Sequence, residues 1–494
     1  MSVEVQDTSH PTSPNDNPNH ARRWLVLCIV GLAQLTVVLD ATIVSIALPQ
    51  AQLDLGISDG DRHWAVTAYA LAFGALLLLG GRIADFWGRK RSFMVGMIGF
   101  ALASAIGGVA QTGLQLFAAR AGQGVFAALL APAALAILTT TFTEGRERAK
   151  AFAVYGAISG GGAAVGLLLG GLLTQYVDWR WCLLVNVPIA LFALAVTAPN
   201  VRETKAHGDV RYDVPGTVLV AVGLGGLVYG FTQAEKHGWD SAQTIGFVAA
   251  GLLALAAFAV VEKRSSHPLL PLYIPWDRNR APALIGSVVI GSVLIGGTLY
   301  LTFYLQIVLG MSPFVSGVAS LPLTVAITVA AGVAAQASTR IGPKLPMAVG
   351  PLVAAAGLVL MLTRIDVDSS YWTVVLPALL VLGFGIGLMI APMQNIALVG
   401  VRDHDAGAAS ALVNATMQIG GALGTALFTT IYVSAKSSAS ASNPAAHPFS
   451  FEVSGYAHVF GWAAVFLVIV SPIVVALVRV TKDELPAEGP VGVH

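Results

Sequence analysis

Two charged residues interrupt long apolar stretches of the sequence. Asp40 lies within the stretch 24–48, and Arg120 lies within the stretch 114–142. At 1.5 Å per helical residue, Asp40 is roughly 12 Å from the end of its stretch and Arg120 roughly 9 Å from the start of its own. Neighbouring antiparallel helices would therefore bring both side chains to a similar depth. A carboxylate balanced between burial and a nearby cation can load and release protons; the alternative is a permanent ion pair that only orders the helices.

A loop of glycine, acidic and basic residues follows the second apolar stretch. It reads Gly81-Arg82-Ile83-Ala84-Asp85-Phe86-Trp87-Gly88-Arg89-Lys90-Arg91. Gly88 permits a tight turn, and Asp85 at a helix end can bind the positive N-terminus of a neighbouring helix. A contact of this kind, made in one conformation and broken in another, predicts a conformational gate that comprises Gly81, Asp85, Gly88, Arg89 and Lys90. The alternative is that the basic residues only fix the orientation of the chain in a membrane.

Glycines recur four residues apart in the fifth apolar stretch, 150–173. The spaced pairs are Gly156/Gly160, Gly162/Gly166 and Gly166/Gly170. Glycines at this spacing line one helix face and let another helix approach closely. We assign this helix-packing face to Gly162, Gly166, Gly170 and Gly171. It predicts either a surface along which two parts of the protein slide or a static contact, and the sequence favours neither.

Polar side chains in other apolar stretches are candidates to line a central substrate cavity. They are Gln34, Gln123, Tyr300, Tyr304, Asn414 and Gln418. For any one of these residues, a hydrogen bond between helices is the alternative role.

Several kinds of chemistry have no sequence signal. The chain contains no GxxxxGK[ST] phosphate loop and no HExxH motif, so we expect neither ATP hydrolysis nor a metal site. No clustered nucleophile, base or metal-ligand set indicates an enzyme. The net charge of +1 gives no electrostatic reason to expect nucleic acid as a partner. Cys28 and Cys182 lie in apolar stretches, and we expect both to be buried thiols.

The composition indicates that lipid surrounds most of the chain. Hydrophobic residues make up 56% of the sequence and charged residues 11%, whereas soluble domains have about 25% charged residues. Continuous apolar stretches of about 20 residues are typical of membrane helices rather than barrel strands. They cover 24–48, 64–83, 92–111, 114–142, 150–173, 181–198, 214–233, 243–262, 281–306, 314–337, 345–363, 372–398, 408–432 and 457–479. The expected fold is all-α and polytopic, with about fourteen spans.

The distribution of basic residues predicts the orientation. If the N-terminus is cytoplasmic, the tails and the loops on that side hold most of the 27 Lys and Arg residues, as the positive-inside rule requires. A thirteen- or fifteen-span arrangement would scramble this asymmetry. An even number of spans places both termini in the cytoplasm.

A repeat divides the predicted spans into two six-helix halves with two inserted helices. Gly88-Arg89-Lys90 follows the second span and Gly342-Pro343-Lys344 follows the tenth, and the Gly-rich fifth span has a partner around Gly420-Gly421. Two such halves with a site at their interface are typical of secondary transporters. The predicted divisions are a disordered cytoplasmic tail (1–21), the first half (22–200), the inserted pair (201–265), the second half (266–480) and a cytoplasmic tail (481–494).

On the basis of these residues and motifs, the chain resembles the fourteen-span drug:proton antiporter group of the major facilitator superfamily, from Trp24 to Arg479. The loop Gly81–Arg91 is similar to the superfamily's signature loop. Leu39–Pro49 resembles the first-helix signature, with Ser45 in place of the usual Asn, and Leu116–Ala128 resembles the fourth-helix motif, whose Arg is linked to proton transfer. Trp179-Arg180-Trp181 and Asn186-Val187-Pro188 match the segment around the sixth span. The fifth-span motif usually contains Gly-Pro; here Leu167 follows Gly166, which should leave that helix straighter.

This resemblance implies a secondary active transporter rather than an enzyme. It implies export of a small amphipathic organic compound, such as an antibiotic or several drugs, by alternating access across the bacterial plasma membrane. The proton is the coupling ion, no other cofactor is expected, and the partners are the substrate, protons and the bilayer, with the chain acting as a monomer. One alternative is transport of an endogenous metabolite such as a siderophore, amino acid or lipid precursor. Another is a membrane scaffold or sensor, which the short tails disfavour.

Overall fold

The computed structural model describes residues 22–143, 145–205, 213–265, 268–402, 405–445, 447–481 and 484. In this part of the chain, 14 helices are long and apolar enough to cross a membrane. The expectation of an all-α polytopic fold is confirmed. The predicted tail 1–21 and almost all of the tail 481–494 lie outside the described residues.

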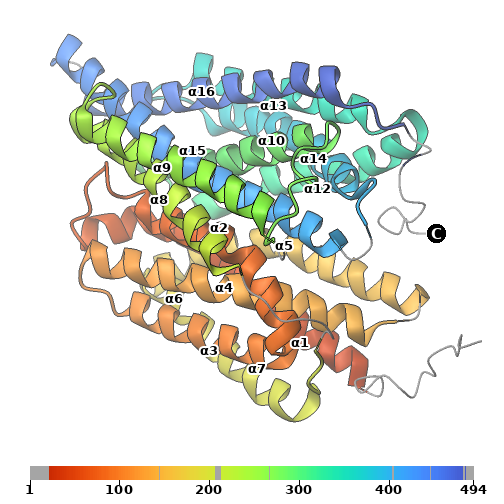
Figure 1. The fold of residues 1–494 in the computed structure, drawn as a ribbon. Helices are drawn as coiled ribbons and strands as arrows, with labels where there is room; N and C mark the ends of the chain where they lie inside the picture. The colour runs from red at the N-terminus through yellow and green to blue at the C-terminus, as the bar shows by residue number, and fades with distance from the viewer. Residues whose placement is uncertain are drawn as a thin grey trace, which may run out of the picture.

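The first six spans form one bundle, drawn from red to yellow in Figure 1. They comprise α1 (Arg23–Asp54), α2 (Trp64–Trp87), α3 (Arg89–Gly108), α4 (Gly113–Thr141), α5 (Gly145–Tyr176), and α6 (Trp181–Leu184) with α7 (Asn186–Asn200). Small residues allow the closest approach between helices: a Cβ at Gly80 of α2 would lie 1.9 Å from the carbonyl oxygen of Ala128 in α4. The dense packing of α2 on α4 therefore requires glycine there.

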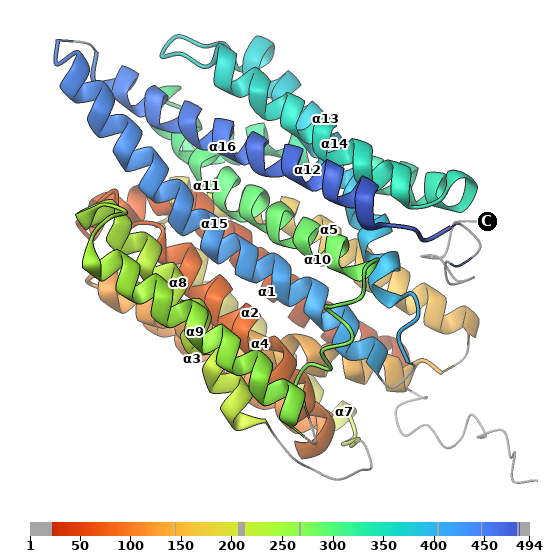
Figure 2. The ribbon, with the colours of Figure 1, turned by 45° about the horizontal axis from the view of Figure 1, so that its top comes forward.

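A helical hairpin follows, formed by α8 (Val214–His237) and α9 (Ala242–Arg264). Both helices begin at polar caps: Asp213 accepts a hydrogen bond from the backbone of Gly216, and Ser241 accepts one from Thr244. The hairpin packs through α8 against α2 and α15 (Ala406–Ser442), as Figure 2 shows. It thus touches helices from both ends of the chain.

The last six spans form a second bundle, drawn from green through teal to blue in Figure 2. Its ninth span contains α10 (Arg280–Gly291), α11 (Thr298–Phe303) and the π-helical segments η3 (Ser292–Gly297) and η4 (Tyr304–Val308). The others are α12 (Pro313–Ile341), α13 (Lys344–Arg364), η5 (Tyr371–Val375) with α14 (Leu376–Leu398), α15, and α16 (Pro448–Leu477). Gly342 between α12 and α13 has a φ of +85°, and Gly88 between α2 and α3 has a φ of +130°. The two glycines that the repeat pairs thus both adopt a positive φ.

The two bundles meet tightly at the end of the molecule opposite to the chain termini. There a Cβ at Gly171 of α5 would lie 2.7 Å from Cα of Phe314 in α12, and the Gln175 side chain accepts a hydrogen bond from the backbone of Phe314 at 3.2 Å. Toward the other end of α5, a Cβ at Gly156 or Gly160 would have no neighbour within 4 Å. The described contacts between α5 and α12 therefore lie at one end of these helices.

One expectation about the cysteines is wrong. Cys182 is buried, but Cys28 on α1 is exposed at the protein surface. An apolar stretch predicts membrane insertion without saying which side of the helix faces protein and which faces outward.

Candidate functional site

Asp40 and Arg120 form an ion pair inside the first bundle. Nη1 of Arg120 lies 2.5 Å from Oδ2 of Asp40, and the side chains are 1% and 0% exposed, respectively. Helix α1 supplies Asp40, and α4 supplies Arg120. The similar depth estimated from helical rise thus corresponds to direct contact.

Neutral polar groups complete the surroundings of the carboxylate. Oδ1 of Asp40 accepts hydrogen bonds from Nε2 of Gln123 and Nδ2 of Asn186, each at 2.8 Å. Gln123 also donates to Ser104 at 2.7 Å and accepts from Arg120 at 2.7 Å. Two helices besides α1, namely α4 and α7, therefore bind one buried carboxylate, and α3 reaches it through Gln123. Buried polar groups of this kind are costly unless their hydrogen bonds are made.

Arg120 has further partners that fix its position. Its Nε donates to the carbonyl oxygen of Ala65 at 2.8 Å, and its guanidinium carbon lies 4.5 Å from the ring centre of Tyr69. Cation–π contact of this type stabilises a desolvated guanidinium. Because these contacts do not involve Asp40, Arg120 would keep partners if the carboxylate were neutralised.

The loop between α2 and α3 has the tight turn expected of Gly88. Two backbone nitrogen atoms at the start of α3 bind the carboxylate of Glu203. The backbone nitrogen of Lys90 donates to it at 3.0 Å, and that of Arg91 donates at 3.1 Å. A Cβ at Gly88 would lie 2.6 Å from the same carboxyl carbon. A side chain at position 88 would thus displace the group that caps α3.

The predicted contact of Asp85 is corrected. Within the described residues, Asp85 pairs with Arg89 at 3.1 Å, one turn away, and does not bind the N-terminus of a neighbouring helix. Glu203, 113 positions beyond Lys90, binds the α3 N-terminus instead, and sequence reasoning missed it. Lys90 donates to the carbonyl oxygen of Ala198 at 2.7 Å. A Cβ at Gly81 would make only an ordinary contact with Pro132, at 3.6 Å.

The glycine face of α5 packs mainly on α1. A Cβ at Gly162 would lie 3.1 Å from Val38, one at Gly166 would lie 3.0 Å from the Leu39 carbonyl oxygen, and one at Gly170 would lie 2.9 Å from Ile43. Gly171 instead faces α12 of the second bundle. Most of this face is therefore a contact inside the first bundle. The expected close contact at Gly156 and Gly160 is wrong, because a Cβ at either position meets open space.

The six predicted cavity residues separate into two groups. Gln123, Tyr300 and Tyr304 are fully buried among side chains, so in this structure they do not line an open cavity, and their role in substrate binding stays a prediction. Gln34 is half-buried and bonded to Tyr155 at 2.7 Å and Ser159 at 3.0 Å. Asn414 is exposed and Gln418 half-buried, one turn apart on α15.

Arg62 connects the two bundles at the end opposite to the termini. It belongs to the loop before α2, yet it is 1% exposed and its guanidinium carbon lies over three rings of the second bundle. The distances to the ring centres are 3.9 Å for Phe303, 4.5 Å for Tyr432 and 5.3 Å for Tyr300. This cluster, together with Tyr456, explains why Tyr300 is inaccessible. Sequence reasoning assigned Arg62 only to a loop.

Ion pairs surround the buried guanidinium. Lys436 of α15 lies 2.7 Å from Asp59 and 2.6 Å from Glu452 of α16. Asp59 in turn lies 3.4 Å from Arg62. Burial raises the pKa of Asp59, but the charges of Arg62 and Lys436 outweigh it and hold that pKa below its ordinary value. Asp59 is therefore a carboxylate that bridges the two bundles.

The family follows from a match that covers most of the chain. The sequence pattern of the Major Facilitator Superfamily matches residues 30–425. The chain is a member of the major facilitator superfamily. It is thus a membrane transporter for small molecules and not an enzyme. The resemblance noted from the Gly81–Arg91 loop and the first-helix signature is confirmed.

Individual superfamily members agree with this assignment. The chain is 51% identical over 407 residues to the puromycin resistance protein of Streptomyces alboniger. The aligned region covers 81% of this chain and 80% of that protein. It is 38% identical over 410 residues to the cephamycin export protein of Amycolatopsis lactamdurans, covering 80% and 82%. A solved structure of a bacterial homologue of the lysosomal transporter Spinster has the same fold, with a TM-score of 0.67 at 15% identity over 94% of this chain and 98% of that chain.

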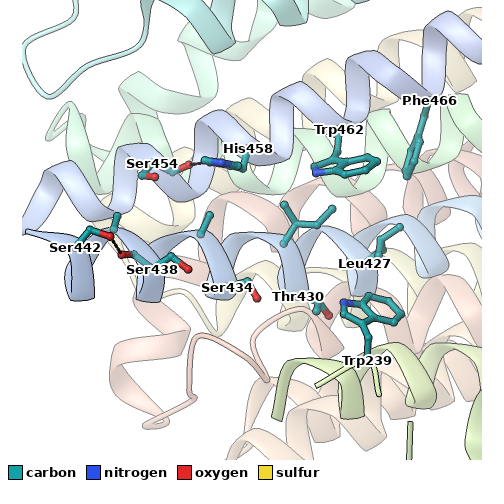
Figure 3. A pocket seen from close by; sticks show the side chains of 13 residues that line it. Trp239, Leu427, Thr430, Ser434, Ser438, Ser442, Ser454, His458, Trp462 and Phe466 are labelled. Carbon is teal, nitrogen blue, oxygen red and sulfur yellow. Dashed lines mark hydrogen bonds between the residues drawn. The ribbon is translucent and has the colours of Figure 1, made fainter. Parts of the chain in front are cut away.

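A groove of about 770 Å³ lies on a different part of this transporter, between α15, α16 and the α8–α9 turn. Figure 3 shows hydroxyl groups of Ser434, Ser438 and Ser454 toward one end and the rings of Trp462 and Phe466 toward the other. None of the six predicted cavity residues lines it. The groove is separate from the Asp40 site, which belongs to the first bundle.

Proposed function

We propose that this transporter exports a small amphipathic, antibiotic-like compound in exchange for protons. The observation that carries the proposal is the buried Asp40–Arg120 pair with its ring of neutral hydrogen-bond partners. Charges within membrane spans are costly and are typical of ion pathways. The names of the relatives, which concern puromycin resistance and cephamycin export, support export over transport of an endogenous metabolite.

Protonation of Asp40 is the coupling step in this proposal. A proton that enters from outside neutralises the carboxylate and releases it from Arg120, which keeps its bonds to Ala65 and Tyr69. The loss of the ion pair loosens α1 from α4. Substrate leaves while the outer side is open, and the proton is released to the cytoplasm after the bundles rock.

The orientation places both termini in the cytoplasm of a bacterial cell, as the basic residues favour. In that orientation the Arg62 cluster closes the outer side of the transporter. Each cycle must therefore break the contacts of Arg62 and Asp59 across the bundles. The loop with Asp85, Gly88 and Arg89 acts at the cytoplasmic side as the second gate. A single chain suffices for this cycle.

The test uses inside-out vesicles that contain the transporter and an imposed proton gradient, acidic inside. Puromycin and cephamycin are the first compounds to assay. We expect uptake of a substrate into the vesicles that depends on the gradient and collapses when a protonophore is added. Uptake that is equal with and without the gradient would mean facilitated diffusion and would exclude proton coupling.

A further inference from the structure

Two acidic residues of the inserted hairpin are buried together at the end of the molecule that bears the termini. Asp213 immediately precedes α8, and Glu262 lies in the last turn of α9. Their side chains are 6% and 3% exposed. Acidic residues are almost never buried this completely without a cation or a proton.

Each carboxyl group has one oxygen that is satisfied by the backbone. Oδ1 of Asp213 accepts from the nitrogen of Gly216 at 2.8 Å, and Oε2 of Glu262 accepts from the nitrogen of Leu270 at 3.1 Å. The second oxygen of each, Oδ2 of Asp213 and Oε1 of Glu262, is buried and accepts from no donor in the described part of the chain. The two carboxyl groups lie within hydrogen-bonding reach of each other. Two acceptors therefore meet where a donor is required.

We propose that Asp213 and Glu262 share one proton and form a second proton-binding site, separate from Asp40. A single proton converts one acceptor into an O–H donor and satisfies both unpartnered oxygens at once. Two ionised carboxylates at this separation would repel each other with little water to screen them. The pair thus holds one proton and one negative charge, which belong to both residues together.

Arg82 of α2 is the charged residue that faces this pair. Besides Asp213, it is the ionisable group that interacts with Glu262 in the described residues. Arg82 also donates a hydrogen bond to the carbonyl oxygen of Pro268, in the segment after α9. When the shared proton leaves, the second negative charge repels the start of α8 from the end of α9 and attracts Arg82. The protonation state of the hairpin is thereby linked to the end of α2 that leads into the Asp85 loop.

Replacing either acid by its amide tests the shared proton. In Glu262→Gln, the amide N–H donates to Asp213, so the shared carboxyl proton is no longer needed. In Asp213→Asn, the amide N–H donates to Glu262 in the same way, and both variants keep the hydrogen bond. The shared proton makes the folded parent protein less stable as the pH rises, because a carboxyl group that is protonated in the folded state must then ionise while buried. We expect the Tm of the detergent-solubilised parent to fall from mildly acidic to alkaline pH, and this fall to become markedly smaller in both variants.

Infrared spectroscopy gives a second, direct readout. At neutral pH the parent protein should show the C=O stretching band of a protonated carboxyl group, and this band should vanish in Glu262→Gln and in Asp213→Asn but persist in Asp40→Asn. A band that persists in both hairpin variants would overturn the proposal. So would a parent whose stability depends on added Na⁺, K⁺ or Mg²⁺ at this site, because a bound cation would then replace the proton. Neither readout requires transport, so the failure of this proposal is distinguishable from that of export.

Discussion

The guanidinium carbon of Arg62 lies 3.9 Å from the ring centre of Phe303, although the two residues belong to opposite bundles. The loop before α2 is thus inserted into the aromatic core of the second bundle. A buried cation over three rings is stabilised by cation–π contact and by packing, with Asp59 as its acidic neighbour. The contact joins the halves at one end, and opening that end requires its removal.

Arg62→Ala should shift the transporter toward the conformation that is open at this end. Loss of a desolvated cation–π contact of about 2 kcal/mol corresponds to a change of roughly thirty-fold in the equilibrium between closed and open forms. Disulfide formation between Gln175→Cys and Phe314→Cys, two positions joined by the hydrogen bond from the Phe314 backbone nitrogen to the Gln175 side chain, reports the closed form. Both native cysteines are first replaced by Ser. We expect less cross-linking in Arg62→Ala; Arg62→Met, which restores packing without charge, separates the two contributions. Unchanged cross-linking in Arg62→Ala would show that Arg62 does not hold the closed form.

Glu203→Ala should lower stability because it removes the acceptor for two nitrogen atoms at the start of α3. A lost N-terminal cap costs about 1–2 kcal/mol, measurable as a lower Tm in detergent. Asp85→Ala is the matched control, since its pair with Arg89 is partly exposed and such pairs contribute about 0.3–0.5 kcal/mol. If both variants had the same Tm, the hydrogen bonds of Glu203 to the start of α3 would not stabilise the protein more than the Asp85–Arg89 pair does.

Gly166→Ala should be destabilising, whereas Gly160→Ala should be tolerated. A Cβ at Gly166 would lie 2.0 Å from Oγ1 of Thr42 and 3.0 Å from the Leu39 carbonyl oxygen, whereas one at Gly160 meets nothing within 4 Å. Overpacking of this kind costs about 1–3 kcal/mol. Thermal melts of both variants measure the difference, and equal Tm values would contradict a tight contact of α5 on α1.

His63 gives a pH dependence that can be measured at the end opposite to the termini. Burial lowers the pKa of His63 to about 4, against the opposing hydrogen bond to the Gly60 carbonyl oxygen at 2.8 Å. In the unfolded chain this imidazole binds a proton near pH 6.5. The contribution of buried, neutral His63 to the free energy of unfolding is therefore fully present above pH 6.5 and is lost as the pH falls toward 4. The loss is on the order of 3 kcal/mol. In His63→Gln the Tm should vary less over this range; an identical pH profile would exclude His63 as the source.

The features that sequence reasoning predicted are those that depend on local pattern. Span length, the positive φ of Gly88 and the similar depth of Asp40 and Arg120 all follow from residues within one helix or turn and from helical rise. Asp40 is chemically conspicuous because few carboxylates occur in apolar stretches. Family resemblance then supplied the substrate class, which no single contact determines.

The features that it missed depend on contacts between distant segments. In the sequence, Arg62 is an ordinary basic residue of a loop. Only the structure shows that Phe303 and Tyr432 surround it, because no spacing in the sequence connects these residues. Glu203 is similarly far from Lys90 along the chain. Tyrosines in a span fit a cavity or a core equally well, because the ring is apolar and the hydroxyl polar; here Tyr300 donates to Thr429 at 2.6 Å inside the core.

The most direct test of proton-coupled export is transport by Asp40→Asn in the inside-out vesicles, at matched protein levels. Asparagine keeps the size of the side chain and one acceptor oxygen, but its amide NH2 replaces the second acceptor and it cannot exchange a proton. The account predicts complete loss of gradient-driven substrate uptake, in a variant whose cooperative thermal melt shows that it is folded. Uptake that still responds to the proton gradient in Asp40→Asn would contradict the role assigned to this carboxylate.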